Sequence, residues 1–168
     1  PAYLVRRART MDFSHAPKVP REAGNPTNDQ AFLPDILDDS PELPSTSHLV
    51  AVDRTGSVAT MTSSIETGFG SRVMVGGFLL NNQLTDFAWS DVKGGLPIAN
   101  RYEPNKRPRS SMAPTLVFGP DGQPRLALGS PGGSRIIGYV AKTVMAVLDW
   151  DMSLQRAIET PHFQNRNG

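Results

Sequence analysis

Six prolines fall within residues 15–45, and their spacing prevents a regular helix or strand from crossing this stretch. Proline fixes φ and lacks a backbone N–H, so it ends helices and interrupts sheet ladders. The prolines are Pro17, Pro20, Pro26, Pro34, Pro41 and Pro44, and acidic residues gather between Asp35 and Glu42. We predict that the stretch is extended or disordered, because burial there would not repay the ordering of its backbone.

Regular patterns of apolar residues lie on both sides of this stretch. Residues 1–13 carry apolar side chains on one face of a predicted helix. After the prolines, residues 49–52 and 58–61 form two apolar runs around the turn signal at 53–56. This arrangement predicts a β-hairpin.

A second hairpin and two helices are predicted further along the chain. The runs 115–118 and 125–128 flank a Gly-Pro-Asp-Gly turn. Residues 134–150 repeat Ile and Val at three- and four-residue steps, which predicts the longest helix. A shorter helix over 153–159 is expected to end before Pro161.

The residues between the two hairpins show less pattern. Residues 77–80 predict a short strand, whereas 64–77 are rich in glycine and 88–111 lack periodicity. We expect both of these segments to be largely irregular. The order of helix, linker, hairpin, loop, hairpin and two helices predicts an α+β layered fold built on an antiparallel sheet.

Composition excludes several classes of function. The 168 residues are enough for one domain with a core. The formal charge is +1 and the basic residues are scattered, a pattern that does not indicate a nucleic-acid-binding surface. Without cysteine there is no thiol catalysis, and three histidines far apart in sequence do not indicate a metal site. No apolar run approaches the ~20 residues of a membrane span. Because the chain begins with Pro1 and shows no signal-peptide pattern, we expect it to be a piece of a longer polypeptide.

Thr46 stands where the proline-rich stretch meets the first predicted hairpin. A hydroxyl is a poor nucleophile without a base, and no His–Asp pair lies at a recognisable spacing. If the bond between Ser45 and Thr46 were cleaved, the freed α-amine, with a pKa of about 7.7, would lie beside the hydroxyl and serve as its base. A threonine at a strand entrance is more commonly a turn or edge residue, so both interpretations stand at this point.

A glycine-rich segment over 129–134 follows a predicted strand and begins the longest predicted helix. Gly132 and Gly133 would allow close approach of a ligand, and N–H groups at a helix start stabilise developing negative charge. A phosphate-binding loop is excluded because no Gly-Lys-Ser/Thr follows. An ordinary strand-to-helix turn remains the alternative.

Two further polar motifs could bind charged groups. Gln83 and Asp86 together offer an amide and a carboxylate for a cationic amine. Ser110 and Ser111 offer adjacent hydroxyls near positive charge, which suits a carboxylate. For each motif, a solvated polar loop is the alternative.

Taken together, four motifs resemble the γ-glutamyltranspeptidase family, whose members are N-terminal nucleophile (Ntn) hydrolases. The motifs are TSHL at 46–49, FLLNNQLTDF at 78–87, PNKRPRSSMAPT at 104–115 and GSPGGSRI at 129–136. The resemblance covers most of 44–168 and continues more weakly through 1–45. It implies part of an αββα sandwich, in which 1–45 is the end of a large subunit with its linker and 46–168 is the catalytic region of a small subunit.

The resemblance also implies roles for individual residues. Thr46 would attack the preceding peptide bond and then serve as the catalytic nucleophile, supported by the hydroxyl of Ser64. Gly132 and Gly133 match the glycines of the oxyanion hole. The implied substrate contacts are Glu66, Gln83 and Asp86 for the α-amino group, and Ser110 and Ser111 for the α-carboxylate. Ser64 and Glu66 stand where Thr and Asn are commoner in the family.

The implied activity is γ-glutamyl transfer from glutathione or another γ-glutamyl amide, through an ester on Thr46, to water or to an amino-acid or peptide acceptor. The resemblance implies no cofactor and no metal. It implies the remainder of the large subunit as a partner, which supplies a substrate-binding arginine, and a periplasmic or secreted location. By itself, this piece is expected to be inactive.

Two alternatives stay open. One is a glutaryl or cephalosporin acylase on the same scaffold, and the other is a non-catalytic fragment or pseudo-enzyme with a binding or structural role. Retention of Gln83, Asp86 and the serine pair favours a γ-glutamyl substrate over one that lacks the amino group.

Overall fold

The computed structural model describes residues 2–12, 14–15 and 45–164. The predicted extended stretch at 15–45 therefore lies almost wholly outside the described residues. The chain divides into two compact units, of which one contains 1–35 with 165–168 and the other contains 36–164. Each unit is described by itself.

In the first unit, helix α1 spans Ala2–Ala8, which is shorter than the predicted 1–13. The N–H groups of Thr10 and Met11 bond to carbonyls three residues back, at 3.1 and 3.0 Å. This tighter bonding is typical of the last turn of a helix and explains the early end. Arg6 and Arg7 lie in the last turn, where positive charge interacts favourably with the helix dipole.

The first predicted hairpin is confirmed in the second unit. Strands β1 (Ser47–Val52) and β2 (Val58–Ser63) pair antiparallel along their whole length. In the turn, the Asp53 carboxylate accepts hydrogen bonds from the N–H groups of Thr55 and Ser57, at 2.8 and 2.9 Å. Both strands are two residues longer than predicted at the open end of the hairpin, because the pairing continues there between polar residues that carry no apolar pattern.

The second hairpin and both following helices are also confirmed. Strands β7 (Thr115–Phe118) and β8 (Pro124–Leu128) pair antiparallel. The short 3-10 helix η2 (Gly133–Arg135) leads into helix α2 (Ile136–Leu148), so the predicted helix is 3-10 in its first turn and ends two residues early. Helix α3 spans Leu154–Glu159.

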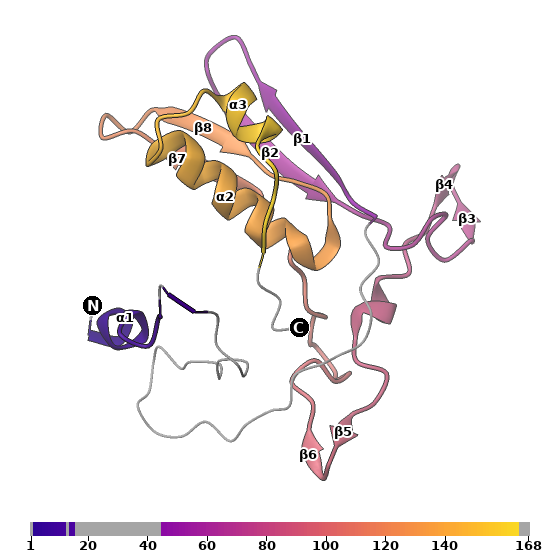
Figure 1. Ribbon diagram of the computed structural model, residues 1–168. Helices are drawn as coiled ribbons and strands as arrows, with labels where there is room; N and C mark the ends of the chain where they lie inside the picture. The colour runs from indigo at the N-terminus through magenta and orange to yellow at the C-terminus, as the bar shows by residue number, and fades with distance from the viewer. Residues whose placement is uncertain (1, 13, 16–44, 165–168) are drawn as a thin grey trace. The chain divides into compact units, whose positions relative to one another are not determined.

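The core of this unit lies between α2 and the β7–β8 hairpin (Figure 1). The buried side chains are Leu126, Leu128, Ile136 and Val140, and the partly buried Ala113, Val117, Val144 and Val147 pack against them. The apolar face of α2 that its three- and four-residue spacing predicts is therefore the face that packs on the hairpin. β8 also packs against β2, which brings the two hairpins together.

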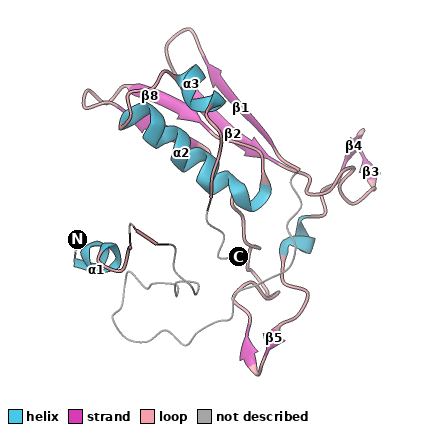
Figure 2. Ribbon diagram, in the orientation of Figure 1, coloured by secondary structure: helices cyan, strands magenta, loops and turns pink. Residues whose placement is uncertain are grey.

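The segments between the hairpins are mostly loops (Figure 2). Two short hairpins interrupt them: β3 (Met74–Val75) with β4 (Phe78–Leu79), and β5 (Val92–Lys93) with β6 (Leu96–Pro97). The short strand predicted at 77–80 is confirmed as β4. The predictions for 64–77 and 88–111 missed β3, β5 and β6, because two-residue strands are too short to produce a periodic pattern. Within 45–164 the strands form four separate two-stranded sheets, so the predicted antiparallel pairing is found but a single continuous sheet is not.

β1 is exposed along most of its length. Leu49, Val50 and Val52 are among the large apolar side chains that face solvent in this unit. Among the described residues, no helix combines the length and the apolar character needed to cross a bilayer.

Candidate active site

Thr46 lies directly before β1, and Ser64 lies directly after β2. Because Ser47 pairs with Ser63, the two residues meet at the open end of the hairpin. The Ser64 hydroxyl donates a hydrogen bond to the carbonyl oxygen of Ser45. That oxygen belongs to the peptide bond between Ser45 and Thr46, so Ser64 contacts the bond at which cleavage is predicted.

Glu66 lies in a tight turn just beyond Ser64. Its φ of +76° is unusual for a residue with a side chain, and such conformations persist only where surrounding contacts enforce them. Here the N–H and the hydroxyl of Thr67 both bond to Oδ1 of Asn82 at 3.1 Å, while the Asn82 N–H bonds to the Ile65 carbonyl at 3.2 Å. These bonds hold the turn against the start of the short 3-10 helix η1 (Gln83–Asp86).

Gln83 connects two carboxylates. Its Nε2 donates to Oε2 of Glu66 at 2.9 Å and to Oδ2 of Asp86 at 2.7 Å. The three side chains therefore form one cluster with two negative charges, which favours a small cationic group such as an ammonium. Within the part of the chain that the structure describes, no group of three or more His, Asp or Glu side chains is placed to hold a metal ion.

Gly132 directly precedes η2, which continues into α2, and Gly133 is the first residue of η2. Their φ values of +133° and +55° lie in the region that glycine adopts most readily. A Cβ atom on Gly132 would also come within 2.8 Å of the Tyr139 ring. The first N–H groups of a helical segment have no partner within that segment, so they can stabilise an anion at this position.

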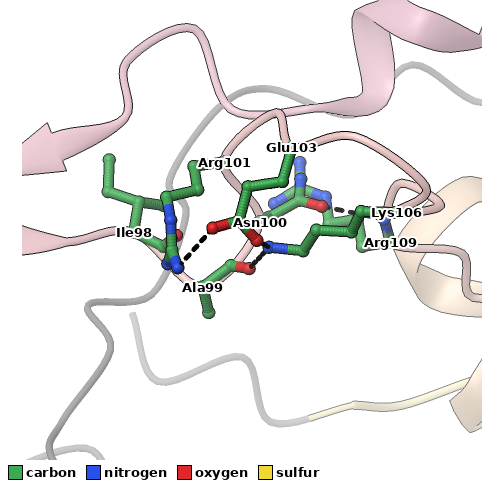
Figure 3. Close-up of polar contacts among 7 residues, drawn as sticks. All are labelled: Ile98, Ala99, Asn100, Arg101, Glu103, Lys106 and Arg109. Carbon is green, nitrogen blue, oxygen red and sulfur yellow. Dashed lines mark hydrogen bonds and ion pairs between the residues drawn. The ribbon is translucent and has the colours of Figure 1, made fainter.

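Ser110 and Ser111 follow a loop that is held by polar contacts (Figure 3). In this loop the Glu103 carboxylate contacts Nη2 of Arg101 at 2.7 Å and Nζ of Lys106 at 3.2 Å. The hydrogen bond from Lys106 is the main cause that holds the pKa of Glu103 below its ordinary value, and the contact with Arg101 is the second. Lys106 also donates to the Ala99 carbonyl at 2.6 Å, which closes the loop.

One pocket brings together eight of the nine residues that the sequence singles out. The eight are Thr46, Ser64, Glu66, Gln83, Asp86, Ser110, Ser111 and Gly133. They come from five separate segments of the chain. Gly132 directly precedes Gly133 but does not line the pocket.

Three residues that the sequence analysis missed also line this pocket: Arg109, Met112 and Ile136. Arg109 and Met112 flank the two serines, so their place in the same motif was a signal that could have found them. Ile136 carries no such signal, because it has the ordinary pattern of an apolar helix residue.

The pocket combines a hydroxyl at a strand entrance, a cluster suited to an amine, and a glycine at a helix start. This set is typical of an enzyme that transfers or hydrolyses an acyl group. The family model described as Gamma-glutamyltranspeptidase matches residues 1–168. The chain belongs to this family, and the resemblance noted in its motifs is confirmed.

Curated relatives carry the name glutathione hydrolase proenzyme. The protein from Bacillus subtilis (strain 168) is 38% identical over 167 residues, which are 96% of this chain and 27% of the relative. The protein from Escherichia coli (strain K12) is 40% identical over 131 residues, which are 72% of this chain and 22% of the relative. The chain thus spans about a quarter of the length of these relatives.

Solved structures of γ-glutamyltranspeptidases share the fold. An acivicin-inhibited enzyme is 39% identical with a TM-score of 0.61, and the match covers 70% of this chain and 65% of that chain. A mutant enzyme from Helicobacter pylori gives the same identity and TM-score, with 70% and 66% covered. The predicted α+β fold of the Ntn-hydrolase type is confirmed by this likeness.

Proposed function

We propose that this chain carries the catalytic centre of a γ-glutamyl transferase and hydrolase that acts on glutathione and related γ-glutamyl amides, with Thr46 as its nucleophile. The observation that carries the proposal is the gathering of eight predicted residues in one pocket. Polar residues of unrelated surface loops would have no reason to converge from five segments on the same cavity. The identities of the curated relatives support the same activity.

The first step in the proposal is cleavage of the bond between Ser45 and Thr46. The Thr46 hydroxyl attacks the Ser45 carbonyl carbon, the C–N bond breaks, and water then hydrolyses the resulting ester to leave a Ser45 carboxylate and a free Thr46 amine. Negative charge develops on the Ser45 carbonyl oxygen during the attack. The hydrogen bond from Ser64 to that oxygen would stabilise this charge. Under this proposal residues 1–45 end one subunit and 46–168 belong to the next.

The second step uses the freed N-terminus. The Thr46 amine accepts the proton of its own hydroxyl, and the hydroxyl oxygen attacks the γ-carbonyl of the substrate. N–H groups at Gly132 and Gly133 would hold the oxyanion, and the leaving amine takes up the proton as the γ-glutamyl ester forms. Water or an acceptor amine then cleaves the ester and restores Thr46.

In this proposal the pocket binds both charged groups at the α-carbon of the substrate. Glu66 and Asp86 bind the α-ammonium, with Gln83 between them, while the paired serines bind the α-carboxylate. With both ends held, the γ-amide is the carbonyl presented to the nucleophile. A glutaryl substrate lacks the ammonium and would make no ion pair with the two carboxylates.

The proposal includes the remainder of the large subunit as a partner, and the exposed apolar side chains of β1 support a covering element at that strand. We expect little activity from these 168 residues by themselves. A periplasmic or secreted location is part of the proposal and follows from the family resemblance alone.

The test uses the complete gene product that contains this chain. Mass spectrometry is expected to find two fragments with a new N-terminus at Thr46, together with turnover of a γ-glutamyl-anilide. Thr46→Ala should stay uncleaved and inactive, whereas Ser47→Ala, which removes an exposed neighbouring hydroxyl, should behave as the wild type. An uncleaved wild type without turnover, or an active Thr46→Ala, would refute the proposal. Faster turnover of a glutaryl-anilide would instead favour the acylase alternative.

A further inference from the structure

Asn100 lies in the loop that precedes the two serines, and its side chain is buried, with 8% of the residue exposed. Its Nδ2 donates to the backbone carbonyl of Asp86 at 2.6 Å, and its Oδ1 accepts from the backbone N–H of Arg109 at 2.8 Å. Its own carbonyl accepts the N–H of Ala88 at 3.0 Å. Figure 3 shows Asn100 between Ala99 and Arg109, in the middle of the polar contacts of the loop.

The two backbone partners of the Asn100 side chain belong to opposite ends of the proposed substrate site. Asp86 is one of the carboxylates for the α-ammonium, and Arg109 directly precedes Ser110, one of the hydroxyls for the α-carboxylate. These residues are far apart along the chain, and both line the pocket. Asn100 does not line it.

We propose that Asn100 is a positioning residue that sets the distance between the ammonium-binding and carboxylate-binding groups of the pocket. The inference rests on the proposed function, since it assumes a donor with both charges at one carbon. In such a donor the two charges are about 3 Å apart and cannot adjust to a wider or narrower site. A shift of the order of an ångström in either segment would then misplace the reacting carbonyl.

The side-chain chemistry explains why an amide suits this position. The Asp86 carbonyl needs a donor and the Arg109 N–H needs an acceptor, and one Asn side chain supplies both. A leucine of similar size supplies neither and would leave both backbone groups without these bonds. An ionised aspartate would accept from Arg109 but would place an oxygen against the Asp86 carbonyl.

The rest of the loop is held independently of Asn100. Ile98 and Phe87 are buried, and Phe87 packs edge to face against Tyr102 with ring centroids 5.2 Å apart. The ion pairs of Glu103 lie near the surface, where such pairs contribute little to stability. Glu103→Gln is therefore a matched control, because it disturbs the same loop without touching either recognition segment.

The experiment compares three anilide donors on the complete gene product: γ-glutamyl, glutaryl without the amino group, and 4-aminobutyryl without the α-carboxylate. Rates are normalised to active sites by titration, so that a lower yield of folded enzyme does not enter the comparison. For Asn100→Leu we expect kcat/KM with the γ-glutamyl donor to fall roughly 10- to 100-fold, while the two truncated donors change less than about threefold. Glu103→Gln should leave all three donors within about twofold of the wild type.

Asn100→Asp provides a second variant if the leucine variant does not fold. At neutral pH it should lose the same selectivity, and at acidic pH it should recover part of it relative to the wild type, because a protonated carboxyl again supplies a donor and an acceptor. A fall by the same factor for all three donors, or unchanged selectivity in both variants, would overturn the inference. A wild type without γ-glutamyl turnover would instead refute the proposed function, so the two failures are distinguishable.

Discussion

Gly129 offers the sharpest test of how the β1–β2 hairpin and the glycine-rich segment 129–133 are coupled. An added Cβ at this position would come within 2.2 Å of Cε1 and 2.3 Å of Nδ1 of His48. The imidazole is held in place by Thr62 on Nδ1 at 2.9 Å and by Thr60 on Nε2 at 3.2 Å. Gly129→Ala must therefore displace a ring that the neighbouring strand holds at both nitrogens.

The expected loss of stability follows from these contacts. Overpacking of this kind costs typically about 1–3 kcal/mol. Displacing the ring would also weaken its two hydrogen bonds, each worth about 0.5–1.5 kcal/mol. We expect Gly129→Ala to lower the free energy of unfolding by about 2–4 kcal/mol. The lower end of this range is the sum of the smallest cost of overpacking and the smallest cost of the two hydrogen bonds.

A double-mutant cycle with His48→Ala measures the coupling by urea denaturation of the complete gene product. In the His48→Ala background the clash is gone, so adding Gly129→Ala should cost less than about 0.5 kcal/mol. Gly68→Ala is the control, because nothing lies within 4 Å of a Cβ at that position. Equal costs of Gly129→Ala in both backgrounds would refute the reasoning.

Two more predictions concern side chains that link α2 to the end of α3 and to the residues after it. Lys142 is 6% exposed, and its Nζ donates to two carbonyls at the end of α3, at 2.8 and 2.7 Å. Lys142→Met should therefore destabilise the protein by about 2 kcal/mol in urea denaturation. The control Lys106→Met, at a more exposed lysine, should cost less than about 1 kcal/mol. The pKa of His162 is lowered from its ordinary 6.5, mainly by burial and to a smaller extent by the charge of Lys142. As the pH falls, the imidazole is therefore protonated in the unfolded chain before it is protonated in the folded one. Stability should decline as the pH falls below about 6.5. The loss of stability between about pH 7.5 and about pH 5.5 should be smaller in His162→Gln, and an unchanged pH dependence in that variant would contradict the assignment.

Local patterns predicted the elements that dominate the described fold. The two long hairpins follow from apolar runs around glycine turns, and α2 follows from the repeat of Ile and Val. These signals work because a hairpin or a helix is specified by residues close together in sequence. The ends of the elements were less predictable, as at α1, because the last turn of a helix depends on how its carbonyls are bonded.

Motif residues predicted most of the pocket, whereas the residues that hold it together were not predicted. Thr46, Gln83 and Asp86 stand in motifs with a chemical rationale, and the structure places them in one cavity. Asn82 and Asn100 connect separate segments through single amide groups. Asn82 stands within the motif at 78–87, but nothing in the local sequence of Asn100 distinguishes it from other loop asparagines.

The sequence by itself determined the chemistry that is available: a hydroxyl at a proline-rich junction, carboxylates and serines in loops, and glycines before a helix. Only the tertiary structure decided that these groups share one pocket and that Ser64 contacts the Ser45 carbonyl. The physical reason is that side-chain chemistry and turn preference are properties of single residues and their neighbours. The spacing between distant loops, in contrast, depends on hydrogen bonds such as those of Asn100, which exist only once the chain has folded.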